Sequence, residues 1–159
     1  MSADFKNRLR ILFWLATLIF SFLILAGIFL APLLGGKSPA AVSAFLYHLF
    51  SSVCHQRPER SFSWFGRPLA VCSRCLGFYA GFFFSVLTYP LWPGRLIKWL
   101  ETRPSLILVA AGPLIVDAVG GLLGLWWTPL GLRLATGALW SAFLPVFWFR
   151  ALNGLKFKS

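Results

Sequence analysis

Four long apolar stretches, separated by short polar segments, make up most of the chain. They cover residues 11–31, 76–93, 105–126 and 130–149, and each contains at most one charged side chain. A helix needs roughly 20 predominantly apolar residues to cross the hydrocarbon core of a bilayer. The pattern therefore predicts an all-α polytopic membrane protein with four transmembrane helices, built as a single membrane domain over residues 1–159.

Residues 39–53 have a different pattern, because their apolar side chains recur at helical spacing on one side only. The segment is short for a crossing, so we predict an amphipathic helix that lies in the membrane interface. Ser38 and Pro39 suit its N-cap and first turn. Residues 54–75 then form a predicted site loop, and residues 94–104 are predicted to form a polar turn.

Small residues recur at every fourth position in two of the predicted spans. Gly77, Gly81 and Ser85 form one such stripe, and Gly120 and Gly124 form the other. Small side chains let two helix backbones approach closely. We expect each stripe to be a helix-packing face, and homo-oligomerisation through these stripes is one option.

Composition agrees with a membrane location. The chain is 58% hydrophobic and 12% charged, with a mean hydropathy of +0.77, whereas soluble domains are about 25% charged. The net charge of +11 arises chiefly from basic residues at the ends of the apolar stretches. Membrane topology and anionic lipid headgroups explain that placement, so the bilayer is the expected partner and nucleic acid is not.

The distribution of basic residues predicts an orientation. If the N-terminus is cytoplasmic, six of the 15 lysines and arginines lie outside and nine lie inside, namely Lys6, Arg8, Arg10, Arg95, Lys98, Arg103, Arg150, Lys156 and Lys158. Cytoplasmic segments of membrane proteins carry an excess of positive charge. We therefore predict a multi-pass protein of the cell inner membrane, with both termini cytoplasmic and residues 54–75 facing outward.

All three cysteines lie in the predicted site loop. Cys72-x2-Cys75 places two thiols within reach of one metal ion, or of each other, and Cys54-His55 lies upstream. We therefore take Cys54, His55, Cys72 and Cys75 as candidate ligands for zinc or iron, with His48 as an alternative histidine. An outward-facing CxxC motif can also form or exchange a disulfide, and buried cysteines can simply pack as small apolar side chains.

Charged residues supply two further groups of candidates. Guanidinium groups bind phosphate or carboxylate through bidentate hydrogen bonds, so the loop arginines are candidates for anion recognition or for contacts with lipid headgroups. They are Arg57, Arg60, Arg67 and Arg74.

A charge inside a membrane span is costly and marks a functional candidate with a partner. Asp117 lies near the middle of residues 105–126, and Arg133 lies one turn inside residues 130–149. Arg133 and Arg74 are the cations available to pair with Asp117. Such a pair would hold helices together, whereas a protonated Asp117 would serve as an acid or proton relay. With His55, Asp117 and Arg133 are the candidate catalytic residues.

The central pattern C-H-Q-x-P-x-R-S-F, followed by C-x-R-C, extends through a set of further positions. The set comprises Cys54-His55-Gln56, Pro58, Arg60-Ser61-Phe62, Gly66, Cys72, Arg74-Cys75, Gly77, Tyr79, Gly81, Asp117, Gly124, Arg133 and Thr136-Gly137. This set resembles the DUF2085 family of small predicted membrane proteins, a domain of unknown function. The resemblance implies a membrane architecture and brings no activity. The chain departs from the family pattern at Ala118, Gly121 and Thr128-Pro129-Leu130.

The sequence leaves three functions open. The leading hypothesis is a membrane protein with an outward-facing Cys/His metal site that acts as an enzyme on a lipid or isoprenoid-type substrate. The second is a membrane thiol-disulfide oxidoreductase coupled to a quinone. The third is a non-catalytic scaffold or transporter subunit.

Overall fold

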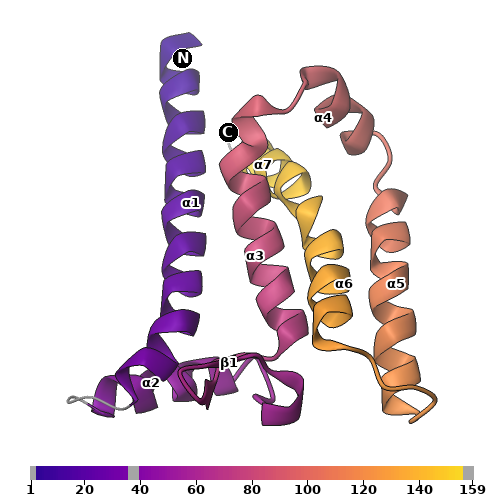
Figure 1. Cartoon of the computed structure of the whole chain (residues 1–159). Coiled ribbons are helices and arrows are strands. Elements are labelled where there is room, and N and C mark those ends of the chain that lie inside the picture. Colours follow the sequence, from indigo (N-terminus) through magenta and orange to yellow (C-terminus); the bar gives the residue numbers. More distant parts are fainter. Residues whose placement is uncertain (1–2, 36–39, 156–159) are drawn as a thin grey trace.

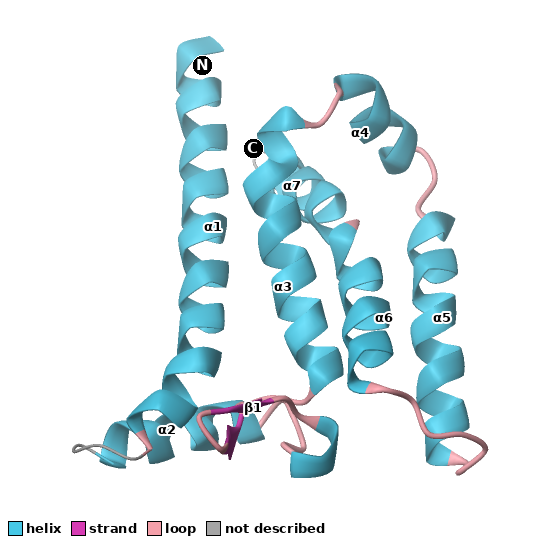
Figure 2. Cartoon of the chain, in the orientation of Figure 1, coloured by secondary structure: helices cyan, strands magenta, loops and turns pink. Residues whose placement is uncertain are grey.

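The computed structural model describes residues 3–35 and 40–155, and most of them are helical (Figure 1, Figure 2). The elements in chain order are α1 (Ala3–Leu34), α2 (Ala40–Ser51), the 3-10 helix η1 (Pro58–Arg60), β1 (Ser63–Trp64), β2 (Arg67–Pro68), α3 (Ser73–Thr88), the 3-10 helix η2 (Tyr89–Leu91), α4 (Gly94–Glu101), α5 (Ser105–Leu122), α6 (Leu130–Ala142) and α7 (Leu144–Leu155). The predicted cap at Ser38 and Pro39 lies outside the described residues.

Three helical segments among the described residues are long and apolar enough to cross a membrane, namely Asn7–Leu34, Ser105–Leu122 and Leu130–Leu152. They correspond to three of the four predicted spans. The fourth predicted span, residues 76–93, forms α3, which has 16 residues and is shorter than these three. Length and composition therefore support a helical membrane protein with three candidate spans.

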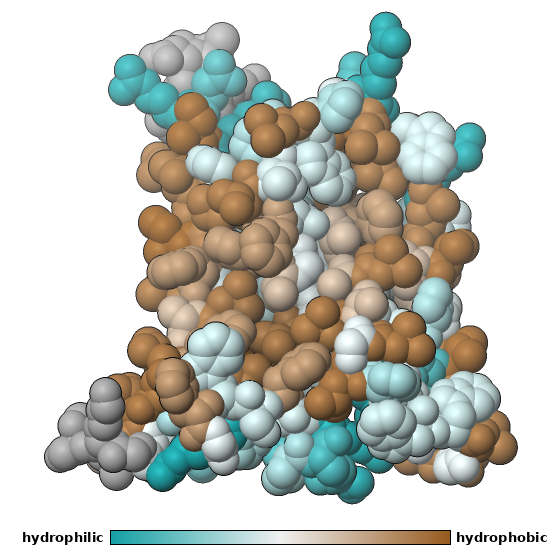
Figure 3. All heavy atoms as spheres, viewed as in Figure 1, coloured by the Kyte–Doolittle hydropathy of each residue, from teal (hydrophilic) through white to brown (hydrophobic). Residues whose placement is uncertain are grey.

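Polar groups gather at the two ends of the molecule and apolar side chains form a broad band between them (Figure 3). At one end lie the N-terminal end of α1, helix α4 and the C-terminal end of α7 (Figure 1). At the other end lie α2, the short hairpin of β1 and β2, and the connection from α5 to α6. This arrangement is expected of a helix bundle whose middle is surrounded by lipid.

Several predicted boundaries differ from the structure. α4 occupies most of the predicted polar turn, because Leu100 is buried in it while Arg95 and Lys98 stay exposed. α5 ends at Leu122, earlier than predicted, and Gly124 follows with a positive φ of 69°, a conformation common just after a helix end.

The predicted site loop also contains structure that the apolar pattern did not reveal. β1 and β2 pair antiparallel around a two-residue turn, Phe65-Gly66. Both turn residues have positive φ, 50° and 74°, as a type I′ hairpin turn requires. The loop ends earlier than predicted, since α3 begins at Ser73 and therefore contains Cys75.

Helices α3 and α6 pack with their backbones in close contact. A Cβ atom on Gly77 would overlap the carbonyl oxygen of Leu134, and one on Gly137 would overlap that of Arg74. Gly81 meets Ala138 in the same way. The stripe of small residues on α3 is thus a packing face, as predicted, and its partner is α6 of the same chain.

The second predicted stripe behaves differently. The Trp126 ring lies against Gly120, where a Cβ atom would overlap it. Gly124 lies beyond the end of α5, with open space where its Cβ would be. The prediction of a helix-packing face at Gly120 and Gly124 is therefore wrong, because the chain folds its own tryptophan onto the first glycine.

The main cluster of buried apolar residues lies at the end of the molecule that carries the cysteines. It joins the end of α1 and α2 to the start of α3, and it comprises Ile28, Ala31, Phe50, Cys54, Leu69, Ala70, Val71 and Leu76. Ser43 of α2 adds a buried hydrogen bond of 2.7 Å to the carbonyl oxygen of Ala31. This packing holds the loop between α2 and α3 against the bundle.

Gly77→Ala and Gly137→Ala are each expected to lower the free energy of unfolding by about 1–3 kcal/mol, because the added methyl group forces α3 and α6 apart. Gly112→Ala is the matched control, since nothing lies within 4 Å of its Cβ position. Thermal unfolding in detergent measures the effect. Equal stability of the three variants would contradict the close contact of α3 and α6.

Candidate metal centre and arginine pocket

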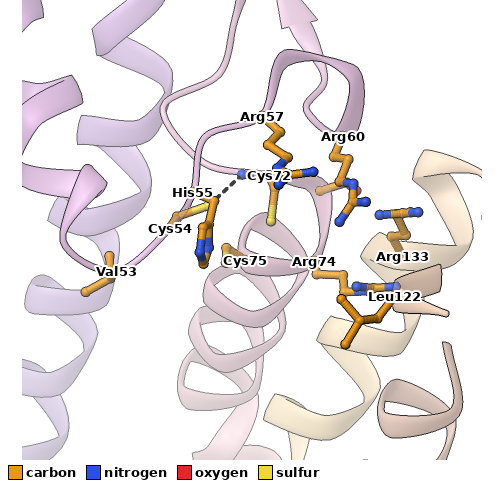
Figure 4. Close-up of a pocket in the computed structure, with 11 residues that line it drawn as sticks. Val53, Cys54, His55, Arg57, Arg60, Cys72, Arg74, Cys75, Leu122 and Arg133 are labelled. Atoms are coloured by element: carbon orange, nitrogen blue, oxygen red, sulfur yellow. Dashed lines mark hydrogen bonds between the residues drawn. The ribbon is translucent and has the colours of Figure 1, made fainter. Parts of the chain in front are cut away.

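The three cysteines come together although the first two are 18 positions apart in the sequence. Cys54 follows α2, Cys72 is the N-cap residue of α3, and Cys75 lies in the first turn of that helix. Their sulfur atoms all lie within 4.8 Å of one another, and all three are free thiols. The backbone N–H of Cys72 also donates a hydrogen bond of 3.2 Å to the Cys54 sulfur (Figure 4).

Gln56 holds the loop in the shape that brings Cys54 to the start of α3. Its side-chain amide donates to the carbonyl oxygens of Tyr47 and Ala70, at 2.7 and 2.8 Å. The Gln56 backbone has a φ of 49°, an uncommon value for a residue other than glycine. The Tyr47 hydroxyl donates to the carbonyl oxygen of Pro68 at 2.5 Å. These bonds tie α2 to both sides of the loop, so Gln56 has a structural role that the sequence pattern did not assign.

The surroundings of Cys72 favour its thiolate. Hydrogen bonds from the Cys54 and Cys75 side chains lower the pKa of Cys72 well below its usual value, and the backbone N–H groups of Cys75 and Arg74 act in the same direction. Partial burial opposes this shift. Thiolate is the form of cysteine that binds metals and attacks disulfides.

The sulfur cluster fits a metal ion. Three thiolates on one tetrahedral zinc ion, with bonds of about 2.3 Å, lie about 3.8 Å apart. The spread of up to 4.8 Å among the three sulfurs is close to that value, and small side-chain rotations would bridge the difference. The three cysteines can therefore hold a metal ion. His55 is exposed and lies outside this group of three.

A pocket of about 300 Å³ adjoins the sulfur cluster. Cysteines and His55 line one side of it, and arginines line the other (Figure 4). Its full lining comprises Val53, Cys54, His55, Arg57, Arg60, Cys72, Ser73, Arg74, Cys75, Leu122 and Arg133. The fold thus brings most of the sequence-predicted site residues to one pocket, whereas Asp117, Arg67 and the alternative ligand His48 are not part of its lining.

Asp117 lies at the centre of a buried polar network. The Arg74 side chain forms an ion pair with it, with Nε donating to the carboxylate at 2.6 Å and a terminal nitrogen donating to the Asp117 carbonyl oxygen at 3.0 Å. The Thr128 hydroxyl donates a short hydrogen bond to the other carboxylate oxygen. Arg133 Nε donates to the Thr128 carbonyl oxygen at 3.0 Å. The network therefore joins α3, α5 and α6.

The sequence offered Arg133 and Arg74 as two possible ion-pair partners for Asp117. Of the two cations available to Asp117, Arg74 forms the pair, and Arg133 joins the network through Thr128. Thr128 belongs to the turn where the chain departs from the family pattern. In this chain that turn contacts Asp117 directly.

The four loop arginines separate into two places. Arg57, Arg60 and Arg74 line the pocket. The Arg67 guanidinium instead lies against Gly35, just past the C-terminal end of α1, where the partial negative charge of a helix end favours a cation. Arg67 is therefore not part of the pocket.

Sequence reasoning missed Ser73 and did not place Gly121. Ser73 is fully buried, lines the pocket, and has a hydroxyl with no hydrogen-bond partner among the described residues. A Cβ atom on Gly121 would lie 3.8 Å from a terminal nitrogen of Arg133 and 3.9 Å from one of Arg74. This departure from the family pattern therefore lies beside the two arginines. The only signal for Ser73 was its place inside Cys72-x2-Cys75.

Comparison with known proteins supports the membrane assignment. The family model described as "Predicted membrane protein (DUF2085)" matches residues 54–147. An uncharacterized protein of Methanocaldococcus jannaschii is 33% identical over 145 residues, covering 86% of this chain and 89% of that protein. An uncharacterized protein of Methanothermobacter thermautotrophicus is 36% identical over 88 residues, covering 55% of this chain and 77% of its own length. No solved structure matches the chain.

Asp117→Asn is expected to lower the free energy of unfolding by about 3 kcal/mol or more, because it leaves the Arg74 charge without its partner. Glu59→Gln is the control, since Glu59 is an exposed acid outside the network. Thermal unfolding in detergent would measure both variants.

The double variant Arg74→Gln with Asp117→Asn separates pairing from a general loss of polar groups. Its cost is expected to be smaller than the sum of the two single costs, since no unpaired charge remains. Additive costs would show that the two side chains do not interact.

Proposed function

The chain belongs to the DUF2085 family of predicted membrane proteins, and we propose that it is a metal-binding membrane protein in which Cys54, Cys72 and Cys75 hold zinc or iron. The observation that carries this proposal is the convergence of the three sulfur atoms within 4.8 Å. Thiolates are the ligands that zinc and iron–sulfur sites prefer among protein side chains.

The proposed site has three protein ligands and an open fourth position. Catalytic zinc sites keep such a position for water or substrate, whereas structural zinc sites are closed by four protein ligands. The pocket beside the sulfur cluster gives a molecule access to that position. His55 is exposed and lines the same pocket, so we assign it to proton transfer with a bound molecule rather than to the fourth ligand position.

We place this site at the outer surface of the membrane. α3 is the proposed fourth crossing, because its 16 residues followed by the three of η2 extend about 30 Å, which matches the hydrocarbon core. Four crossings put both termini on one side, as Figure 1 suggests from the positions of the two chain ends. The basic residues at that end favour the cytoplasm. Helix α2 then lies in the opposite interface.

The reaction we propose is metal-assisted chemistry on a lipid or isoprenoid-type molecule. The pocket lies beside the start of α3 and the end of α5, at the end of the molecule that carries α2 (Figure 1), where a headgroup would lie while its chain stays in the bilayer. A bound metal ion would supply a Lewis acid or an activated water. Arg57, Arg60 and Arg74 would line the site for an anionic group of this molecule, Asp117 would fix the orientation of Arg74, and Arg133 would complete the basic side of the pocket.

Protein purified in detergent without chelator is expected to contain about one zinc or iron ion per chain, with its three thiols protected from alkylation. Cys54→Ser, Cys72→Ser and Cys75→Ser are each expected to lose most of the metal, because two thiolates bind far more weakly than three. Metal mass spectrometry with a free-thiol count measures both quantities.

His55→Ala is expected to keep the metal, as is the control His48→Ala on α2. Loss of metal in His55→Ala alone would show that His55 is the fourth ligand. Absence of metal with one free thiol would instead indicate a disulfide and favour the quinone-coupled oxidoreductase. Absence of metal with three free thiols would contradict both functions.

Reporter fusions test the four crossings. A fluorescent protein is expected to fold and fluoresce at either terminus, because both lie in the cytoplasm. Alkaline phosphatase inserted between Phe65 and Gly66 is expected to be active, since the enzyme folds only outside. If one terminus reports from outside, the number of crossings is odd and the topology with four crossings is overturned.

A further inference from the structure

Four guanidinium groups converge on one side of the pocket. Arg57 and Arg60 reach it from the loop around η1, Arg74 from the start of α3 and Arg133 from α6 (Figure 4). Like charges held together at a half-buried site repel one another, and this repulsion persists unless an anion lies between them. The arrangement therefore requires a source of negative charge.

The protein supplies only part of that charge. Asp117 is bonded to Arg74 and to Thr128, and no carboxylate lines the pocket among the described residues. Within the same part of the chain, the side chains of Arg57 and Arg60 have neither an ion-pair nor a hydrogen-bond partner. Arg133 uses its Nε for the Thr128 carbonyl oxygen, and its guanidinium lines the pocket. Three cations are thus left facing the same space.

A second observation points to a ligand with hydrogen-bond acceptors. Ser73 lines the pocket, and its hydroxyl is buried with no acceptor or donor of the described residues within reach. Leaving a buried polar group unsatisfied costs about 1–3 kcal/mol by itself. Ser73 is also the first residue of α3, and the N-terminal end of a helix favours an anion. A bound oxyanion would satisfy the hydroxyl and the arginines together.

We propose that this pocket binds a phosphate monoester, with its oxygens held by Arg60, Arg133 and the Ser73 hydroxyl. A carboxylate has two oxygens and suits a single arginine fork. A phosphate monoester has three terminal oxygens and a charge near −2, which fits donors that arrive from three separate elements. The proposal deepens the function proposed above, since it names the substrate class of the same site.

The rim of the pocket indicates how such a group is presented. Val53 and Leu122 line the pocket and are 60% and 84% exposed. Apolar side chains this exposed in a membrane protein favour contact with lipid acyl chains. A lipid phosphate monoester and free phosphate present the same oxygens to the arginines. The apolar rim favours the lipid, because only the lipid has acyl chains that can lie against it.

Calorimetric titration of the full purified chain tests the proposal. The probes are inorganic phosphate, short-chain phosphatidic acid as a lipid phosphate monoester, and phosphatidylcholine of the same chain length. Phosphatidic acid is expected to bind at least about tenfold more tightly than phosphatidylcholine. Equal binding of inorganic phosphate would assign the site to free phosphate. Binding of none of the three, or equal binding of both lipids, would overturn the proposal.

Variants separate the site from general electrostatic attraction. Arg60→Gln is expected to weaken phosphatidic acid binding at least about tenfold. Ser73→Ala is expected to weaken it severalfold. Arg95→Gln, an equal change of charge on exposed α4 at the opposite end, is expected to bind as the unaltered protein does. Ser73→Ala should unfold at the same temperature as the parent or higher, because the hydroxyl has no partner in the fold. Equal loss in Arg60→Gln and Arg95→Gln would overturn the proposal.

The metal content of every sample is measured alongside, so that the two proposals fail separately. Full metal content without phosphate binding would overturn the phosphate site and leave the metal centre standing. Phosphate binding to protein that never contains metal would overturn the metal centre and leave the phosphate site standing.

Discussion

The ion pair between Arg74 and Asp117 is the interaction on which the arrangement of the pocket depends. Charges are costly in a helix bundle surrounded by lipid, and they persist there only when they are paired and hydrogen-bonded. Arg74 lies two residues beyond Cys72, so pairing it with Asp117 also fixes the start of α3 against α5. Thr128 extends the network to the turn before α6. One carboxylate thus sets the relative position of three helices at the pocket.

The glycine contacts between α3 and α6 supply the complementary constraint. Leu134 and Arg74 meet the opposing helix through their backbone oxygens, at Gly77 and Gly137, so little side-chain volume separates the two helices. Backbones at this distance place Arg133, near the start of α6, beside the first turn of α3, where the cysteines lie. The ion pair and the glycine contacts therefore act together. The ion pair sets the register of α3 against α5, and the glycine contacts set the distance between α3 and α6.

Sequence patterns predicted the features that depend on local composition. Long apolar runs predicted the helical spans, CxxC predicted that thiols would meet, and the mid-span charge predicted a partner for Asp117. The pattern could not predict contacts that arise only in three dimensions. α4 was missed because eight residues show too few turns for periodicity, and the hairpin was missed because Phe65 is an unusual residue for a positive φ. The bonds from Gln56 to Tyr47 and Ala70 join distant residues, so no spacing in the sequence reveals them.

The charges of the proposed metal centre and of the arginines are compatible with one shared pocket. Three thiolates with a divalent ion carry one net negative charge, and Asp117 carries another. The four arginines carry four positive charges, so the two negative charges leave the pocket with a net charge of +2. A phosphate monoester, with a charge near −2, neutralises it. Without a metal ion a protonated thiol contributes no negative charge, so the arginines would attract an outside anion in that state as well. With a divalent ion bound, the proposed pocket would therefore be charge-balanced for a phosphate monoester, so the two proposed ligands are compatible within one site.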